Sequence, residues 1–340
     1  MILSTLCYLE RDGKYLMLHR VVKKNDVNKD KWIGIGGKFE AGESPEDCLL
    51  REAMEETGYR LTSFRLRGLL TFLYNGDPAE YIFLYTADGF EGTAVDCDEG
   101  TLEWVSKEEI DKLNLWEGDR IFFDLLNQDA PFFSLKLEYN GNRLVSAALD
   151  GRPLELYDVL LPDGTPSGLT RERTILHRHG DFHRASHVWI ARKGEDGSVE
   201  LLLQKRAASK DSFPGCYDIS SAGHVAAGEE FLSAAVRELE EELGITARPE
   251  DLRFAGYHEE QFEQEFHGQV FRNHELGAVY VYEKPVDENA LPLQKSEVES
   301  VRWMRLADVD LAAREHDPAF CIFPDETELL RQFFAGEREG

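Results

Sequence analysis

Long apolar runs, cysteine and positive charge are all scarce in this sequence of 340 residues. No stretch approaches the roughly 18 consecutive apolar residues of a membrane-spanning helix, so we expect no membrane partner. The N-terminal segment is interrupted by charged residues, among them Glu10 and Arg11. This pattern argues against a signal peptide and favours a pair of strands.

Cysteine is rare, and its spacing carries no recognisable pattern. The five cysteines include no Cys-x-x-Cys pair and are Cys7, Cys48, Cys97, Cys216 and Cys321. Disulfide frameworks and zinc cages built from cysteines need them at recurring, close spacings, so we expect neither. A reducing, cytoplasmic location fits this usage best.

The balance of charge is strongly acidic. Lysine and arginine number 38 against 65 aspartates and glutamates, which gives a formal net charge of −27. A surface of this sign repels DNA and RNA, so we expect no long nucleic-acid partner. A small anionic substrate stays compatible with the charge if a bound cation reverses it locally.

One pattern of residues occurs twice, in the first motif (residues 37–59) and the second motif (residues 223–245). Both fit Gly, five residues, Glu, seven residues, Arg-Glu, a hydrophobe, any residue, Glu-Glu, any residue, Gly and a hydrophobe. The copies lie too far apart for a solenoid repeat and indicate two domains of one kind. Hairpin signals on either side of Leu149–Pro153 place the boundary there, which gives domains 1–150 and 151–340.

The first motif predicts a helix with a defined start and stop. Ser44 is a preferred N-cap, Pro45 suits the first helical position, and Asp47 places a carboxylate three residues after the cap. Gly58 provides the C-terminal stop. The predicted apolar stripe consists of Leu49, Leu50, Ala53 and Met54.

Three carboxylates of this helix, Glu52, Glu55 and Glu56, fall within one face. Like charges so close together repel each other unless something compensates them. A cluster of oxygen ligands on a rigid element suits Mg²⁺ or Mn²⁺, which bridge phosphate oxygens and activate water. Arg51 can orient the carboxylates, and Gly37 allows close approach of a backbone carbonyl as a further ligand.

The second motif repeats this design. Its acidic face consists of Glu238, Glu241 and Glu242, preceded by Arg237 and followed by Gly244. A solvated acidic helix face is the ordinary explanation of such a stretch. We favour the metal site because the full spacing occurs twice with identical gaps. The apolar stripe predicted for this helix consists of Leu232, Ala235, Val236, Leu239 and Leu243.

Both motifs resemble the Nudix box at every defining position. The resemblance implies an α/β fold, with two α/β/α sandwich domains that each hold a mixed sheet between helices. It also implies hydrolysis of a nucleoside diphosphate linked to another moiety, with nucleoside di- or triphosphates as small-molecule substrates and Mg²⁺ or Mn²⁺ as cofactor. The metal ligands carried over are the Gly37 carbonyl, Glu52, Glu55 and Glu56, then the Gly223 carbonyl, Glu238, Glu241 and Glu242. Arg51 and Arg237 join these glutamates as catalytic candidates.

The first domain resembles the 8-oxo-dGTP diphosphatase branch of this family through residues 102–126. That resemblance assigns the purine-binding positions to Trp116 and Asp119, where an indole face stacks and a carboxyl group hydrogen-bonds. Two positions depart from the branch, since Gly118 replaces a second acid and Ile33 replaces an asparagine. Packing in the core is the alternative explanation of Trp116.

The second domain resembles Nudix proteins related to isopentenyl-diphosphate isomerase. Those isomerases use a cysteine where this chain has Ala222, and a metal site of histidines and two glutamates. His183, His224 and Glu275 match part of that site, but Asn273 replaces the other glutamate. Loss of the cysteine and retention of the complete box favour hydrolysis of another diphosphate. The alternatives are an isomerase-type enzyme and a non-catalytic binding or regulatory module.

Several further residues are candidates for contact with substrate. Lys205 and Arg206 end an apolar strand ahead of the second motif, and Arg20 has the matching position ahead of the first. Charge-assisted hydrogen bonds from such groups suit phosphate. Lys38, within the first motif, belongs to the same set, and a solvated strand end explains the strand-end residues equally well. The histidines His177, His179 and His183 are candidates for the second pocket or for ordinary surface positions.

Overall fold

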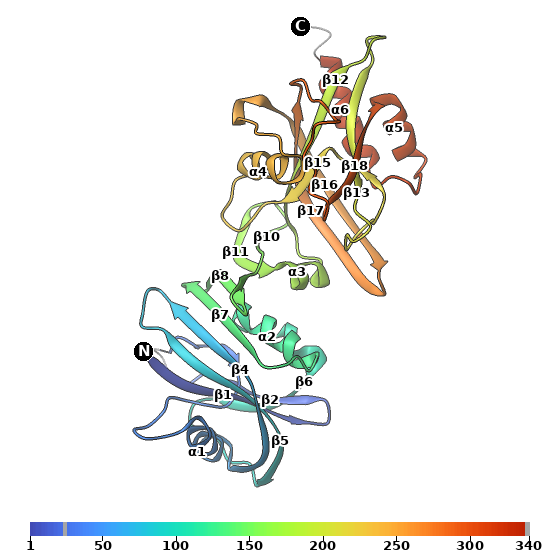
Figure 1. Cartoon of the computed structure of the whole chain (residues 1–340). Coiled ribbons are helices and arrows are strands. Elements are labelled where there is room, and N and C mark those ends of the chain that lie inside the picture. The colour runs from blue at the N-terminus through green and yellow to red at the C-terminus, as the bar shows by residue number, and fades with distance from the viewer. Residues whose placement is uncertain (23–25, 337–340) are drawn as a thin grey trace. The chain divides into compact units, whose positions relative to one another are not determined.

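A computed structural model describes residues 1–22 and 26–336 of the chain (Figure 1). The chain forms two compact units. Unit 1 comprises Met1–Leu156 and Leu169–Ile175, and unit 2 comprises Tyr157–Gly168 and Leu176–Gly340. The chain therefore passes from unit 1 to unit 2, returns for a short segment, and passes again. The strands β10 (Leu156–Leu160) and β11 (Pro166–Glu172) of this region form a two-stranded sheet.

Unit 1 is built on a mixed sheet, whose described part has the strand order β3-β2-β1-β5-β4-β7-β8-β9, with β6 paired to β2. β1 runs parallel to β5 and antiparallel to β2, while β4 is antiparallel to β5 and parallel to β7. The strands are β1 (Ile2–Arg11), β2 (Lys14–His19), β3 (Trp32–Ile33), β4 (Tyr59–Tyr74), β5 (Glu80–Gly92), β6 (Thr101–Ser106), β7 (Phe133–Asn140), β8 (Arg143–Leu149) and β9 (Arg152–Pro153).

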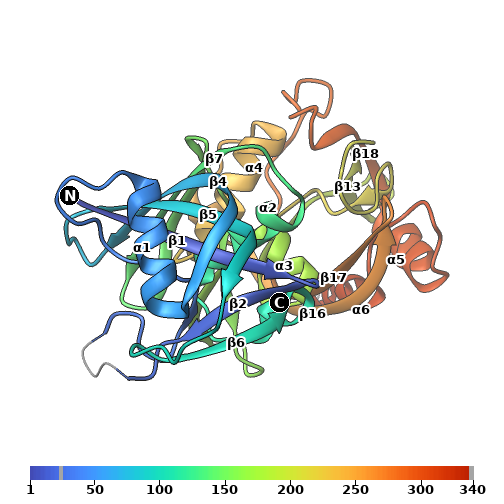
Figure 2. The same cartoon turned by 90° about the horizontal axis from the view of Figure 1, so that it is seen from below.

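The helices of unit 1 cover both faces of this sheet, because successive residues of a strand point to opposite faces. Cys7 and Leu9 of β1 pack in one core with α1 (Pro45–Thr57), and Figure 2 shows α1 crossing the strands. Tyr8, between them, contacts Phe122 and Phe123 of α2 (Glu117–Asn127) on the other face. A short 3₁₀ helix, η1 (Lys107–Lys112), follows β6.

Unit 2 repeats the mixed sheet, with the strand order β14-β13-β12-β17-β16 in its described part. In addition, β15 pairs with β12 and β18 pairs with β13. β12 runs parallel to β17 and antiparallel to β13. The strands are β12 (His183–Lys193), β13 (Val199–Arg206), β14 (Tyr217–Asp218), β15 (Ser221–His224), β16 (Leu252–Phe266), β17 (Gln269–Tyr282) and β18 (Val298–Arg305).

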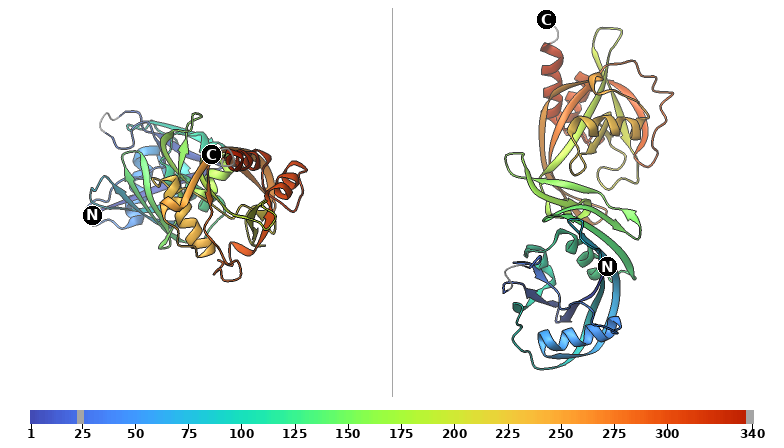
Figure 3. Two further views of the ribbon diagram at one scale, coloured as in Figure 1. Left: turned by 90° about the horizontal axis from the view of Figure 1, so that it is seen from above. Right: turned by 90° about the vertical axis from the view of Figure 1, so that its left-hand side faces the viewer.

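Two helical layers also enclose this second sheet (Figure 3). Val188 and Ile190 of β12 share a core with α4, whereas Trp189 and Ala191 share the opposite core with α5 and α6. The helices are α4 (Phe231–Leu243), α5 (Leu306–Arg314), α6 (Pro324–Gly336) and the 3₁₀ helix η2 (Pro249–Asp251). The short helix α3 (Arg173–His179) begins in unit 1 and ends in unit 2. The predicted fold class, two mixed sheets each held between helices, is confirmed.

The stripe predicted for the first helix is wrong at two positions. Leu50 and Met54 are 38% and 45% exposed, and the buried residues are Cys48, Leu49, Ala53, Glu56 and Thr57. The helix is rotated so that Glu56, rather than the two apolar side chains, faces the sheet. In residues 1–22 and 26–336, no helix combines the length and apolar character needed to cross a membrane.

Candidate active sites

The start of α1 is fixed by reciprocal hydrogen bonds. The Ser44 hydroxyl accepts from the backbone N–H of Asp47 at 3.1 Å, and the Asp47 carboxylate accepts from the N–H of Ser44 at 3.0 Å. Gly58 closes the helix in the left-handed conformation, with its N–H donating to the carbonyl of Met54. These caps set the register of the acidic side chains along the helix.

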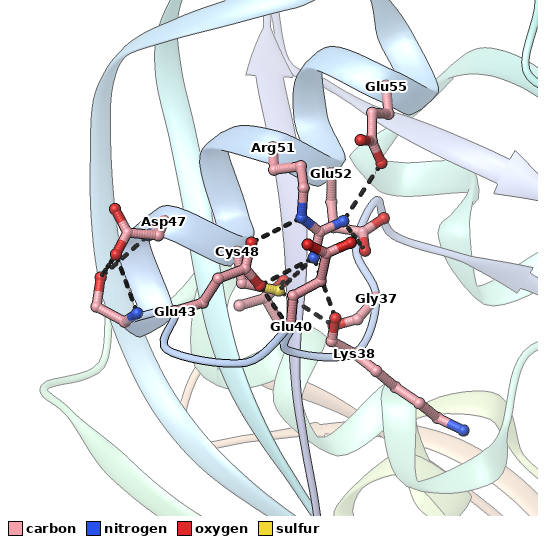
Figure 4. A network of polar contacts seen from close by, with 11 residues as sticks. Gly37, Lys38, Glu40, Glu43, Asp47, Cys48, Arg51, Glu52 and Glu55 are labelled. Carbon is pink, nitrogen blue, oxygen red and sulfur yellow. Dashed lines mark hydrogen bonds and ion pairs between the residues drawn. The ribbon is translucent and has the colours of Figure 1, made fainter.

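Arg51 lies at the centre of the first motif (Figure 4). Its Nε and Nη2 donate to the two carboxylate oxygens of Glu43 at 2.7 and 3.0 Å. Its Nη1 donates to Glu52 at 2.7 Å and to Glu55 at 3.3 Å, and Nη2 also reaches the Lys38 carbonyl at 3.1 Å. The guanidinium therefore ties the loop before the helix to the acidic residues on it. The Arg51 hydrogen bonds lower the pKa of Glu43 to about 2.

Glu52 and Glu56 lie directly against the glycine loop that precedes the helix. A Cβ atom at Gly37 would stand only 2.3 Å from a Glu52 carboxylate oxygen, so any other residue at this position would displace that carboxylate. The N–H of Gly36 donates to Glu56 at 2.9 Å. The three glutamates are thus not equivalent, because Glu56 is buried whereas the side chain of Glu55 is 60% exposed.

Unit 2 reproduces this arrangement almost atom for atom. The Nε and Nη2 of Arg237 donate to both oxygens of Glu229 at 3.1 and 2.9 Å. Its Nη1 donates to Glu238 at 2.6 Å and to Glu241 at 3.2 Å, and Nη2 reaches the His224 carbonyl at 3.2 Å. The two motifs therefore converge on one geometry as well as one sequence pattern.

The glycine contact and the buried glutamate recur in the same way. A Cβ at Gly223 would lie 2.0 Å from the carboxyl carbon of Glu238, and the N–H of Ala222 donates to Glu242 at 3.3 Å. Burial raises the pKa of Glu242 to about 8, and burial also raises the pKa of Glu238. Unlike α1, helix α4 begins at Glu230 without a side-chain cap.

The donor sets of both motifs fit a hard divalent cation. Each supplies carboxylate oxygens from three glutamates beside a glycine with no side chain, and such oxygens are the ligands that Mg²⁺ and Mn²⁺ prefer. Packing carboxylates this close together is unfavourable without a compensating cation. The raised pKa of Glu242 shows that burial disfavours the charged form of this carboxylate.

Trp116 and Asp119 lie together in unit 1, at the start of α2. Trp116 is 4% exposed, and its indole N–H donates to Asn28 at 2.8 Å. Its ring contacts Phe72, Tyr74 and Tyr139 edge-on. Burial raises the pKa of Asp119 to about 8, although the nearby Lys31 acts in the opposite direction.

The glycine at position 118 has a structural reason. A Cβ there would lie 2.7 Å from the Tyr139 hydroxyl, which accepts a hydrogen bond from the Gly118 N–H at 2.7 Å. A side chain at position 118 would therefore have to displace Leu137 and Tyr139. Lys31 lies over the Trp116 ring at 5.0 Å. The sequence analysis missed Asn28, Lys31 and Tyr139, because no local pattern links them to the start of α2.

The basic candidates are largely engaged with carboxylates. Arg20 pairs with Asp26 and Glu99, and Lys205 donates to Glu299 at 2.8 Å. Arg206 donates to Asp218 at 2.7 Å. The side chain of Lys38 extends away from Arg51 and the acidic cluster (Figure 4). Their assignment to substrate phosphate stays a prediction.

A histidine cluster, defined as His177, His183 and His224, lies next to the second motif. One ring nitrogen from each histidine lies within 4.8 Å of the others, so the group can hold a metal ion. The carboxylate of Glu275 lies 3.5 Å from the Nε2 of His183 and 3.7 Å from that of His224. His179 lies 3.8 Å from Asp181 instead. His224 joins this cluster to the motif, because it follows Gly223.

A second set of buried polar side chains continues from Glu275. His187 lies 3.9 Å from Glu275 through Nε2, and its Nδ1 lies 3.1 Å from Glu326 of α6. Burial acts to lower the pKa of His187, but the carboxylates of Glu326 and Glu275 outweigh it and raise the value to about 10. Sequence analysis missed this pair, because 139 residues separate His187 from Glu326.

Comparison with protein families finds one match, in two places. The model of the NUDIX domain matches residues 3–126 and 181–325, which together include both motifs.

Individual relatives cover parts of the chain. Nudix hydrolase 3 of Arabidopsis thaliana is 40% identical over 189 residues, which is 53% of this chain and 23% of the plant protein. The mouse (Mus musculus) protein named oxidized purine nucleoside triphosphate hydrolase is 31% identical over 112 residues, or 33% of this chain and 72% of the mouse protein. Among solved structures, the MutT protein from Bacillus halodurans is 27% identical and covers 45% of this chain and 100% of its own, with a TM-score of 0.40.

Proposed function

Because this chain belongs to the NUDIX family, whose domain it contains twice, we propose that it is a hydrolase with two catalytic units that cleave diphosphate linkages in nucleotides. One observation carries the proposal. In both units an arginine binds three glutamates at matching positions, Glu43, Glu52 and Glu55 in unit 1 and Glu229, Glu238 and Glu241 in unit 2. In each unit the second of these carboxylates lies directly against a glycine of the preceding loop. A silent binding module has no need for mutually repelling carboxylates held in this way.

The residues of each motif have different roles in the proposed reaction. When Mg²⁺ or Mn²⁺ is bound, it supplies positive charge to phosphate oxygens and lowers the pKa of a bound water. Glu52, Glu55 and Glu56 would hold it in unit 1, and Glu238, Glu241 and Glu242 would hold it in unit 2. Arg51 fixes the orientation of Glu52 and Glu55, and Arg237 does the same for Glu238 and Glu241. The backbone N–H groups of Gly36 and Ala222 hold Glu56 and Glu242. Both arginines also keep the preceding loop closed against the helix.

Unit 1 is proposed to hydrolyse 8-oxo-dGTP or other non-standard nucleoside triphosphates to the monophosphate. The start of α2 supports a purine ligand, since the Asp119 N–H donates to the Trp116 carbonyl and an indole ring, which can stack on a base, is thereby held close to a carboxyl group. Asp119, with a pKa of about 8, is protonated at neutral pH and can donate a hydrogen bond to a base. The name of the mouse relative points to the same substrate class.

Unit 2 is proposed to hydrolyse a different diphosphate, whose identity is open. We further propose that the histidine cluster and Glu275 hold a transition-metal ion, since imidazole nitrogens and a carboxylate suit such ions. This cluster favours a second candidate function, isomerisation of a prenyl diphosphate. The alanine at position 222 weighs against it, because a methyl group can neither donate nor accept a proton.

The location of the activity is proposed to be the cytoplasm. All five cysteines are free thiols, as expected in a reducing compartment. The basic residues Arg20, Lys38, Lys205 and Arg206 are retained as candidate contacts for substrate. Arg20, Lys205 and Arg206 would have to exchange a carboxylate partner for phosphate.

The decisive experiment assigns each activity to its own unit of the full chain. Wild type, Glu56→Gln and Glu242→Gln would be screened with Mg²⁺ against 8-oxo-dGTP, ordinary nucleotides, ADP-ribose, nucleotide sugars and isopentenyl diphosphate. Loss of 8-oxo-dGTP hydrolysis in Glu56→Gln alone is the expected result. If isopentenyl diphosphate yielded an isomerised product, isomerisation would replace hydrolysis as the proposed function of unit 2. Unchanged turnover in both variants would reject the carboxylate assignment.

A further inference from the structure

A buried carboxylate of the last helix reaches into the interior of unit 2. Glu326 of α6 is 1% exposed, and one of its oxygens accepts from the Trp189 indole N–H at 2.7 Å. The same oxygen lies 3.1 Å from the Nδ1 of His187. Both partners come from one face of β12. Burying a carboxylate is costly unless it is paired. Glu326 is paired with Trp189 and His187, and the question is what this buried pair does.

The ring of His187 connects this carboxylate to a second one. Its Nδ1 faces Glu326 and its Nε2 lies 3.9 Å from Glu275 on β17. The ring lies against the backbone of β17 at Gly277, where a Cβ would come within 2.9 Å of it. The fold has thus made room for an imidazole between two carboxylates.

Glu275 in turn lies against the histidine cluster. One carboxylate oxygen is 3.9 Å from His187, while the other is 3.5 Å from His183 and 3.7 Å from His224. The parallel pairing of β12 with β17 sets His183 directly opposite Glu275. Side chains from three elements therefore form one line, Glu326–His187–Glu275, that ends at the cluster.

We propose that Glu326 is a positioning residue of the unit 2 site: through His187 it holds the Glu275 carboxylate against His183 and His224, so that the cluster binds a divalent transition metal. This inference rests on the proposed metal-binding role of the histidine cluster. Groups that orient a metal ligand set the affinity of the site without touching the ion, and here His187 reaches Glu275 by a charge contact at 3.9 Å. The C-terminal helix α6 is then a part of the site.

A purely structural role is the competing explanation, in which Glu326 only fastens α6 to the sheet. The two roles differ in what Glu326→Gln should change. Glutamine keeps the size of the side chain and an acceptor oxygen for the Trp189 N–H, so the packing is retained. It removes the charge that attracts His187, and with it the force that orients the ring toward Glu275.

The test measures metal affinity rather than turnover. Zn²⁺ is titrated into the full-length wild type and its variants by calorimetry, with excess Mg²⁺ present to occupy the carboxylates of the two motifs. Glu326→Gln should weaken Zn²⁺ binding by about 10- to 100-fold, the usual effect of removing such a partner. The matched control is Glu328→Gln on the same helix, whose carboxylate pairs with Arg314 and Arg331 on the surface; it should leave the affinity unchanged.

A second variant guards against failure of the first to fold. His187→Gln should give the same loss of affinity, and combining it with Glu326→Gln should add little, because both act through Glu275. Equal Zn²⁺ affinity in Glu326→Gln and Glu328→Gln would overturn the proposal, even if Glu326→Gln lowered the unfolding temperature. Zn²⁺ binding that survives His183→Ala would overturn it too, by removing the cluster as the metal site. Neither result would contradict the proposal that unit 2 is a hydrolase, which Glu242→Gln tests separately.

Discussion

Each motif arginine uses most of its donors on carboxylates that flank it in the sequence. Arg51 binds both oxygens of Glu43 on one side and reaches Glu52 and Glu55 on the other. A planar guanidinium can make such a set of bonds, whereas an ammonium group presents a single point charge. The loop and the helix therefore depend on one side chain for their relative position.

Arg51→Lys should lower the rate of hydrolysis by unit 1 by about 10- to 100-fold, because the bidentate hydrogen bond to Glu43 is lost while the positive charge stays. The measurement is kcat and KM for 8-oxo-dGTP, with the activity of unit 2 as an internal reference. Arg60→Lys, at an exposed ion pair with Glu91, is the control and should have no effect. Wild-type rates in Arg51→Lys would show that the arginine is dispensable.

Asp119 makes the stability of unit 1 depend on pH. Because burial raises its pKa from 3.8 to about 8, the folded state binds a proton more tightly than the unfolded state. The stability gained from this proton is fully present below about pH 4 and is lost as the pH rises through about 8. Asp119→Asn, which cannot titrate, should remove this dependence.

The check is thermal unfolding of the full chain with a chelator, at several pH values between about 4 and 9. The unfolding temperature of the wild type minus that of Asp119→Asn should fall as the pH rises and level off above about pH 8. A difference that stays constant across this range would contradict a neutral Asp119.

At the scale of elements, the two helices that carry the motifs differ in how they begin. The first has a reciprocal cap between Ser44 and Asp47, and the second begins at Glu230 with no side-chain cap. Ser44→Ala should therefore cost about 1 kcal/mol of stability in unit 1, the usual value of such a cap. Glu230→Ala should have a much smaller effect on unit 2. Urea unfolding of the two variants provides the comparison, and equal losses would contradict the difference between the caps.

Local sequence was sufficient for features that depend on neighbours in the chain. The start of α1 at Ser44, its end at Gly58 and the hairpin turn at Asn140-Gly141 are all encoded within a few residues. The rotation of α1 was not predictable in this way. Leu50 and Met54 were expected to be buried, but the helix turns Glu56 toward the Gly36 N–H instead. A buried polar contact to a distant loop overrides the hydrophobic stripe.

In the candidate sites as well, contacts between residues far apart in the sequence could not be predicted. The motif glutamates were found because their spacing repeats. By contrast, the sequence gives no signal that Asn28 meets Trp116, or that Glu326 meets His187. These contacts follow from strand order and helix packing, which a single sequence does not specify.

At the scale of the whole molecule, the family domain occurs twice, and the two copies differ in the polar side chains beside the motif. Both copies keep the arginine-centred carboxylates, but the histidine cluster lies in unit 2. This difference is consistent with the proposal that the two units act on different substrates. The carboxylate variants of each unit therefore separate the activities within a single polypeptide.

The short return of the chain to unit 1 has a practical consequence for anyone who wishes to divide the gene. Leu169–Ile175 belongs to unit 1 although Tyr157–Gly168 before it belongs to unit 2. Within this segment the Thr170 hydroxyl donates to the Leu144 carbonyl, and Arg171 donates to Glu117 at 3.1 Å. A stop codon after residue 150 would delete these contacts, and a start codon at residue 151 would leave them without partners. No single cut yields two intact halves. Inactivity of a truncated fragment would therefore be explained by the missing segment and would say nothing about its catalytic residues.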